Sequence, residues 1–239
     1  MAKLDYFSAL ISLFYPPVCA GCSAHVGSNV YLCDVCQAKA QRIVAPFCQK
    51  CSEPFFGAID GPFTCGNCAH QKLHFEAAAS AYLSRGIVRQ LVHEFKYGKK
   101  IHLRYVIAEW LYAALEDPRL QGRPFDILVP VPLHPARQRD RGFNQAALLA
   151  DLVSQRASLP VRAVLERVRY TTTQTAFDRA KRMENLHDAF RLRKKGDVRG
   201  LRVLLIDDIL TTGSTLSECA RVLKHAGAAS VYAATAARA

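Results

Sequence analysis

The chain has 239 residues, of which 32 are Lys or Arg and 20 are Asp or Glu, so its formal charge at pH 7 is +12. About 50% of the residues are hydrophobic, which excludes a disordered chain, and no apolar run reaches the roughly 18 residues that a membrane-spanning helix needs. The longest candidate, residues 4–18, contains Asp5 and ends in Pro16 and Pro17, so we expect a short amphipathic helix and not an export signal. The composition therefore predicts a cytoplasmic protein with no membrane span.

Charge and cysteine are unevenly divided along the chain. Residues 1–75 carry a net charge of +1 and eight of the nine cysteines, whereas residues 76–239 carry +11 and only Cys219. Such an abrupt change in composition indicates two units that are stabilised in different ways. We predict an N-terminal module over residues 1–75 and a larger domain over residues 76–239, with Cys219 in the core of that domain.

The N-terminal cysteines share one spacing. They form four C-x-x-C pairs: Cys19/Cys22, Cys33/Cys36, Cys48/Cys51 and Cys65/Cys68. Each pair supplies half of a tetrahedral zinc site, so the module is predicted to hold two structural four-cysteine sites, whose metal supplies folding free energy. Disulfides would require export, and thioredoxin-like redox chemistry would require a single pair. The short gaps favour sequential pairing of the knuckles, and crossed pairing is the alternative.

The larger domain alternates predicted helices and strands. Apolar spacing predicts helices over residues 85–95 and 102–115, and a short apolar run closed by prolines predicts a strand over residues 125–132. A helix over residues 144–154, a buried strand over 201–206, a helix over 214–226 and a strand over 230–235 follow. This alternation predicts an α/β fold with an open parallel sheet, helices on both faces, and a ligand site at the carboxyl ends of the strands.

The strongest chemical signal directly follows the strand over residues 201–206. Asp207 and Asp208 come first, and a small hydroxyl-rich loop leads into the next helix: Thr211, Thr212, Gly213, Ser214 and Thr215. Backbone N–H groups, hydroxyls and a helix N-terminus make a phosphate cradle, and the two carboxylates suit vicinal sugar hydroxyls. A turn and helix cap alone would need only one such residue. The pattern therefore predicts a site for a ribose 5-phosphate.

With these residues identified, the chain resembles a known family. Residues 205–215 resemble the phosphoribosyl pyrophosphate (PRPP) motif of type I phosphoribosyltransferases. The four cysteine knuckles ahead of that motif, together with residues 141–145 (Arg-Gly-Phe-Asn-Gln), resemble the competence-protein ComF family over nearly the whole chain. The resemblance implies a type I phosphoribosyltransferase-like sheet preceded by a double zinc ribbon, and it assigns Asp207 and Asp208 to the ribose and Thr211 to Thr215 to the 5′-phosphate.

The resemblance also implies roles for basic residues elsewhere in the domain. The loop after residues 129–132 matches the pyrophosphate loop and carries Arg137, Arg139 and Arg141, although a solvated basic helix start is the plainer interpretation. Residues 172–185 match a lid over the reaction centre, in which Arg182 is the predicted catalytic cation and a solvated helix is the alternative. Mg²⁺ is expected with PRPP because it prefers phosphate oxygens and water. Lys96-Tyr97-Gly98 matches a further family motif with no role that follows from its chemistry.

Two functional interpretations follow from the resemblance. In the first, the protein transfers a phosphoribosyl group from PRPP to an unidentified acceptor. In the second, it is a non-catalytic PRPP sensor or single-stranded-DNA-binding scaffold that acts with other DNA-uptake proteins in natural transformation. Residues 134–202 carry a net charge of +9, which suits a phosphate backbone, but their four aromatic residues are too scattered for a base-stacking platform. The charge favours a polyphosphate ligand first and DNA second.

Overall fold

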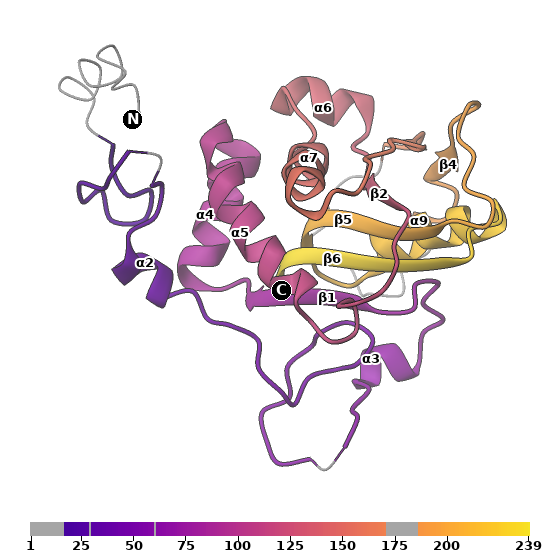
Figure 1. Cartoon of the computed structure of the whole chain (residues 1–239), viewed down its shortest axis with the longest axis horizontal. Coiled ribbons are helices and arrows are strands. Elements are labelled where there is room, and N and C mark those ends of the chain that lie inside the picture. The colour runs from indigo at the N-terminus through magenta and orange to yellow at the C-terminus, as the bar shows by residue number, and fades with distance from the viewer. Residues whose placement is uncertain (1–16, 29, 60, 171–185) are drawn as a thin grey trace.

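A computed structural model describes residues 17–28, 30–59, 61–170 and 186–239 (Figure 1). Its main sheet has four strands, all parallel, in the order β1 (Ala78–Leu83), β6 (Ser230–Arg238), β5 (Arg202–Leu210), β2 (Ile127–Pro130). A separate antiparallel hairpin joins β3 (Leu165–Arg167) to β4 (Phe190–Leu192). The predicted open parallel sheet is confirmed.

Helices cover both faces of the sheet. One face packs against α4 (Gly86–Tyr97), the short 3₁₀ helix η1 (Ile101–Leu103), α5 (Arg104–Leu115) and α7 (Gln145–Ala157), and the other packs against α9 (Ser214–His225). Alternation along β5 builds both layers, since Leu204 and Ile206 face the first set of helices and Val203 and Leu205 face α9. A strand buried on both faces reads as a continuous apolar run, as residues 201–206 do.

In the described part of the chain, three further helices are short. They are α2 (Asp34–Ala38), α3 (Gly66–Ala69) and α6 (Pro135–Arg141), and α6 begins at a His134 N-cap whose Nδ1 accepts a hydrogen bond from the Ala136 N–H at 3.2 Å. None of the helices among the described residues is both long and apolar enough to cross a bilayer.

The chain that joins the two cysteine groups passes along the edge strand β1; Figure 1 shows the first group's segment in indigo beside α4 and the second group's segment in violet below β1. Backbone hydrogen bonds join Ile43 N–H to the Ala81 carbonyl and Leu83 N–H to the Gln41 carbonyl, both at 2.8 Å. Residues 41–43 therefore cover the free edge of β1, which would otherwise present unpaired backbone groups. The N-terminal module and the sheet share this hydrogen-bonded seam.

Two features of the sheet lie beyond what the apolar pattern predicted. The first is β1 itself, which is buried throughout. The second is the length of β5, which continues to Leu210 and takes Asp207 and Asp208 into the strand. The acidic pair is consequently held by ladder hydrogen bonds to β6, where Asp207 is in register with Thr235.

Candidate functional site

The acidic pair lies near the carboxyl end of β5. Asp208 is buried, with 1% of its surface exposed, and its Oδ2 lies 2.7 Å from the Nζ of Lys96 in the last turn of α4. The Asp208 N–H donates to Oδ1 of Asp207 at 2.9 Å. The pair is therefore tied both to the neighbouring helix and to its own backbone, and Lys96 supplies the local positive charge.

The electrostatic state of Asp207 differs from that of an ordinary carboxyl. Burial, and then the adjacent Asp208 carboxylate, raise the pKa of Asp207 to about 8, and Lys96 offsets only part of this rise. The neutral form of this carboxyl is therefore favoured more than in an ordinary aspartate. An incoming ribose hydroxyl or divalent cation would favour its ionised form.

The hydroxyl-rich loop connects β5 to α9. Gly213 adopts φ 81° and caps α9, a conformation that favours glycine, and Ser214 begins the helix. The hydroxyl oxygens of Thr212 and Ser214 lie 2.9 Å apart, and the Ser214 N–H donates to Thr212 Oγ1 at 3.3 Å. Thr211 is exposed and Thr215 half-buried at the two ends of the loop. The structure thus brings the predicted phosphate cradle to the same strand end as the acidic pair.

The three predicted pyrophosphate arginines do not lie together. Arg137 and Arg141, four residues apart on α6, line a hollow of about 190 Å³ with Lys96, Tyr97 and Lys99. The Arg141 guanidinium lies 5.1 Å from the centre of the Tyr97 ring, and one of its N–H groups donates to Gln145 at 2.5 Å. Lys96 also pairs with Asp208, so this hollow adjoins the acidic pair.

Arg139 lines a different and larger cavity, of about 770 Å³, between α6, the start of α7 and the β3–β4 hairpin. The same cavity is lined by Arg167, Arg193 and the residues at the end of β2. Because the Val131 N–H donates to the Ile206 carbonyl at 3.0 Å, the end of β2 lies beside the strand position that precedes Asp207. The large cavity therefore lies at the end of the strand that neighbours β5.

The predicted lid lies outside the described residues. Arg182 lies within residues 171–185, which the structure does not describe. Residues 1–16, with most of the predicted N-terminal helix, also lie outside the described residues. The described flanks of the lid are β3 and β4, which pair as an antiparallel hairpin.

The eight N-terminal cysteines form two groups, each with its sulfur atoms within 4.8 Å of one another. The first group holds Cys19, Cys22, Cys33 and Cys36, and the second holds Cys48, Cys51, Cys65 and Cys68, which is the sequential pairing. The Cys22–Cys33 and Cys51–Cys65 sulfurs are both 3.7 Å apart. This spacing fits the edge of about 3.8 Å that a tetrahedron with Zn–S bonds of about 2.3 Å has. We call residues 17–40 the first ribbon and residues 46–70 the second ribbon.

Backbone donors and the closeness of the sulfur atoms shift the pKa values of the thiols in both groups. Burial opposes ionisation of Cys19, but N–H groups of Cys33, Gly21 and Cys22 outweigh it and lower its pKa to about 6. In the second group, hydrogen bonds from Cys51 and Cys68 hold the pKa of Cys48 well below its usual range, while the bond to Cys48 raises that of Cys51 to about 12. Four sulfurs so close together suit a dication that replaces their protons.

Lys96 is the site residue that chemical reasoning on the sequence left without a role. Its motif, Lys96-Tyr97-Gly98, was noticed through the resemblance, but only the end of α4 beside β5 explains it. Arg167 was not singled out at all. Its guanidinium lies 5.3 Å from the centre of the Phe190 ring, across the β3–β4 hairpin, and it lines the large cavity. No local pattern distinguishes it from the other arginines of this basic stretch.

Comparison with known proteins matches both parts of the chain. A double zinc ribbon domain matches residues 10–69, and a phosphoribosyl transferase domain matches residues 144–239. Competence protein F of Haemophilus influenzae is 32% identical over 214 residues, which cover 87% of this chain and 90% of that protein. DNA utilization protein YhgH of Salmonella typhi is 32% identical over 223 residues, which cover 92% of this chain and 96% of that protein.

Among solved structures, the purine phosphoribosyltransferase of Pyrococcus horikoshii aligns with a TM-score of 0.35 and 17% sequence identity. The alignment covers 54% of this chain and 70% of that one. The double zinc ribbon match covers both cysteine groups, and the phosphoribosyl transferase match covers the acidic pair.

Proposed function

The chain belongs to the family of competence protein F and DNA utilization protein YhgH, and from that premise we propose that it binds PRPP with Mg²⁺ and transfers the phosphoribosyl group to an acceptor. One observation carries this proposal. A carboxylate pair, a hydroxyl-rich loop and a cluster of cations converge at the carboxyl end of β5. Each of these three features matches one part of PRPP: the ribose diol, the 5′-phosphate and the pyrophosphate.

Each feature is assigned one part of the ligand. Asp207 and Asp208 accept hydrogen bonds from the ribose hydroxyls, and the loop from Thr211 to Thr215 binds the 5′-phosphate through hydroxyls, N–H groups and the start of α9. Arg137 and Arg141, with Lys96 and Lys99, bind the pyrophosphate. Arg139 stays a predicted pyrophosphate contact, from the opposite side of α6.

The acidic pair fits Mg²⁺ through oxygen donors alone, because Mg²⁺ prefers carboxylate, phosphate and water oxygens. Asp207, whose pKa is raised to about 8, would gain a counter-charge from the cation. When bound, Mg²⁺ would neutralise part of the pyrophosphate charge. The protein's own cations hold the departing group in place.

In the proposed reaction, the bond from the anomeric carbon of PRPP to the pyrophosphate oxygen breaks, and a bond from that carbon to the acceptor's nucleophilic atom forms. The pyrophosphate leaves with the bonding electron pair, and the acceptor loses its proton. Arg182 is proposed to stabilise the departing pyrophosphate from the predicted lid. The acceptor is proposed to enter through the large cavity, beside the end of β2.

Calorimetry tests the ligand assignment. We expect wild-type protein to bind PRPP in the presence of Mg²⁺, and Asp207→Asn/Asp208→Asn to lose about 100-fold or more in affinity, since two charge-assisted contacts disappear. Asp126→Asn is the matched control, because Asp126 pairs with Arg202 at the opposite end of β5. PRPP affinity that survives the double substitution would refute the site.

Catalysis is tested separately, by pyrophosphate release from PRPP with nucleobases, amines and nucleic acids as candidate acceptors. Release that depends on one acceptor and is lost in Arg182→Ala supports the transferase proposal. PRPP binding without release for any acceptor class would favour a PRPP sensor instead.

DNA is a second proposed partner. The printed names of the relatives refer to competence and DNA utilization, and residues 134–202 carry a net charge of +9. Backbone binding through this stretch predicts that affinity for single-stranded DNA falls steeply as salt rises. An affinity that barely changes with salt would contradict it. The reduced cysteines required by both zinc groups support the cytoplasm as the proposed location.

A further inference from the structure

The segment that follows the second ribbon contacts the phosphate loop, residues Thr211 to Thr215, and the start of α9. The ring of Phe75, which follows this ribbon and is 1% exposed, lies under Gly213, where a Cβ atom would be 3.7 Å from the tip of the ring. One residue earlier, the His74 N–H donates to the Ser217 hydroxyl in the first turn of α9 at 3.1 Å. The segment that leaves the second ribbon thus supports the loop and the helix that begins there.

A buried cation ties the same ribbon to the residue before the loop. Arg238, with 2% of its side chain exposed, forms an ion pair with Glu53, two residues after Cys51 of the Cys48–Cys51 knuckle. Its guanidinium also donates to the Leu210 carbonyl at 3.3 Å, and Thr211 follows Leu210 as the first loop residue. Glu53 therefore orients a side chain that holds the end of β5.

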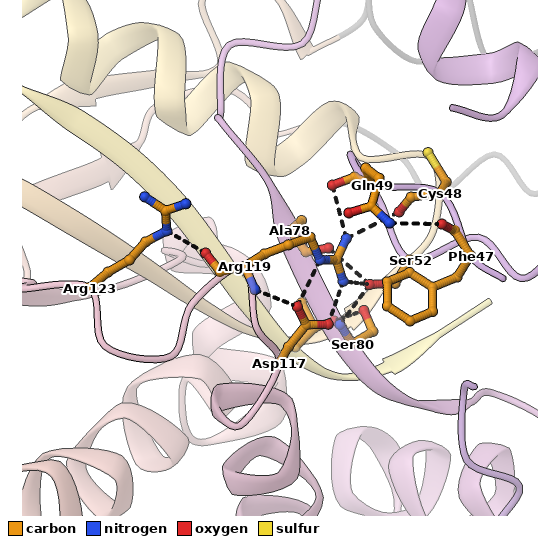
Figure 2. Close-up of polar contacts among 10 residues, drawn as sticks. Phe47, Cys48, Gln49, Ser52, Ala78, Ser80, Asp117, Arg119 and Arg123 are labelled. Carbon is orange, nitrogen blue, oxygen red and sulfur yellow. Dashed lines mark hydrogen bonds and ion pairs between the residues drawn. The ribbon is translucent and has the colours of Figure 1, made fainter. Parts of the chain in front are cut away.

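A second arginine holds the knuckle itself in place (Figure 2). Arg119 donates to the Cys48 and Gln49 carbonyls at 3.1 and 3.0 Å and to the Ser52 hydroxyl at 2.7 Å, while Asp117 pairs with its other edge at 2.6 Å. The buried Ser52 hydroxyl donates to the Ala78 carbonyl and accepts from the Ser80 N–H, both at 3.0 Å. These hydrogen bonds therefore fix the position of the knuckle relative to β1.

The hydrophobic packing agrees with these contacts. Three zinc ligands of the second ribbon, Cys48, Cys51 and Cys65, belong to the same buried cluster as Phe75 and as Leu210 and Leu216, which flank the phosphate loop. The first ribbon packs on the opposite layer, where Cys19 and Cys36 join the cluster of α4 and α5. Among the described residues of the two ribbons, those of the second share a buried cluster with the residues on either side of the loop.

We propose that the second ribbon is a positioning element of the phosphate site, acting through Phe75 and the Glu53–Arg238 pair. The inference rests on the proposed PRPP function, since it names what sets the geometry of that site. Zinc bound by the second cysteine group keeps Glu53 and the segment up to Phe75 in place, and these hold Leu210 and Gly213. Loss of this zinc then loosens the loop from Thr211 to Thr215, while loss of zinc from the first ribbon leaves the loop ordered.

Two measurements on the full-length protein test this proposal: hydrogen exchange of the amides of residues 211–217, and PRPP affinity by calorimetry. Cys68→Ser removes one ligand of the second group, and Cys22→Ser removes one ligand of the first. We expect Cys68→Ser to speed loop exchange and to weaken PRPP binding about tenfold or more, against about twofold or less for Cys22→Ser. Zinc content, measured in parallel, verifies that each variant has lost one metal.

A milder pair of variants keeps all eight cysteines. Glu53→Gln removes the charge that pairs with Arg238, and Glu109→Gln removes a comparable charge that pairs with Arg156 at 3.2 Å on the outer side of α5. We expect faster loop exchange and an affinity lower by about threefold to fivefold for Glu53→Gln, and no change for Glu109→Gln. If Cys68→Ser does not fold, the comparison of Glu53→Gln with Glu109→Gln tests the positioning role on its own.

The two proposals fail in different ways. Wild-type protein that does not bind PRPP would refute the proposed function, yet loop exchange would still report on the positioning role. Unchanged loop exchange in Glu53→Gln, or in folded Cys68→Ser that has lost one zinc, would refute the positioning role even if PRPP binds tightly.

Discussion

The two ribbons have the same ligands and different neighbours. Each closes a four-cysteine group from two C-x-x-C knuckles with matching sulfur spacing, and each has a backbone N–H group that donates to a cysteine sulfur at 3.3 Å. The first ribbon packs on α4 and α5, and the second packs beneath α9 and the phosphate loop. Metal chemistry therefore determines the local fold of a ribbon, and the residues around it determine what the ribbon can influence.

The contacts that dock the ribbons also differ in kind. The first uses neutral groups: Gln37 accepts from the Trp110 indole at 3.0 Å, and the Tyr31 ring stacks on Tyr105 with 5.4 Å between centres. The second uses two arginines of low exposure, Arg119 and Arg238. Neutral hydrogen bonds contribute little net free energy, whereas a charged group that loses its partner is costly, so the second interface responds more sharply to change.

The largest expected effect comes from removing one side chain from the docking contacts of each ribbon: Arg119, which holds the second ribbon, and Gln37 in the first. Arg119→Met leaves Asp117, which is 11% exposed, without its cation and leaves the Ser52 and knuckle contacts unmade. We expect the free energy of unfolding to fall by about 3 kcal/mol, as for other partly buried pairs that lose one member. Gln37→Met removes neutral hydrogen bonds only, and about 1 kcal/mol is expected. Urea denaturation at constant zinc measures both.

The zinc content of both variants serves as the control, since neither substitution touches a ligand. Arg119→Lys keeps the charge but not the planar donor fork, and an intermediate loss is expected. Equal destabilisation by Arg119→Met and Gln37→Met would contradict the distinction between a charged and a neutral interface.

Zinc release provides the next comparison. Cys22 in the first group is exposed, whereas Cys48, Cys51 and Cys65 in the second are buried. With a chromogenic chelator in excess, we expect two kinetic phases of equal amplitude, the first about tenfold faster than the second, because a ligand exchange step needs access to sulfur. Cys22→Ser should remove the fast phase and Cys68→Ser the slow one.

Reciprocity sharpens this experiment. If zinc in the second ribbon strengthens PRPP binding, PRPP must stabilise that zinc by the same free energy. We expect saturating PRPP to slow the slow phase about severalfold and to leave the fast phase unchanged. An equal effect on both phases would indicate general stabilisation of the protein and not coupling through the phosphate loop.

Much of this architecture could be predicted from local patterns. The apolar spacing of the helix from Gly86 to Tyr97, the continuous apolar run at residues 201–206 and the repeated C-x-x-C spacing are each local patterns that indicate the structure found. β1 could not be predicted in the same way, because its sequence, AASAYL, is dominated by small residues without alternation. Its pairing with β6, more than 150 residues later in the chain, makes it a strand.

The candidate site divides along the same line. Asp207, Asp208 and the phosphate loop form one contiguous segment, so their chemistry could be read directly. Lys96 and Arg238 act on this segment from α4 and from the end of β6, and nothing next to them in sequence indicates a partner. Residues whose role arises from a tertiary contact gain their meaning only when the sheet order is known.

The smallest expected effect tests the site without altering either ribbon. The pKa of Asp207 is raised to about 8 in the fold, against about 3.9 in an unfolded chain, so wild-type protein loses stability as pH rises between these values because the unfolded state releases the proton first. Asp207→Asn cannot ionise and escapes this loss. We expect the variant to equal wild type near pH 4 and to exceed it by about 1 kcal/mol at pH 8.5, a value reduced from the full shift because the carboxyl is half-buried.

Asp126 provides a control of opposite sign. Hydrogen bonds from Arg202 lower its pKa to about 2, so Asp126→Asn should be less stable than wild type by a nearly constant amount from about pH 5 upward, above the range in which this carboxyl titrates. Thermal unfolding of both variants across pH 4–9 gives the two profiles. Both zinc-release phases should keep their wild-type rates in Asp207→Asn without ligand, because its substitution changes the phosphate site and not the segment from Glu53 to Phe75. A stability gain that is the same at every pH would show that the raised pKa is not its cause.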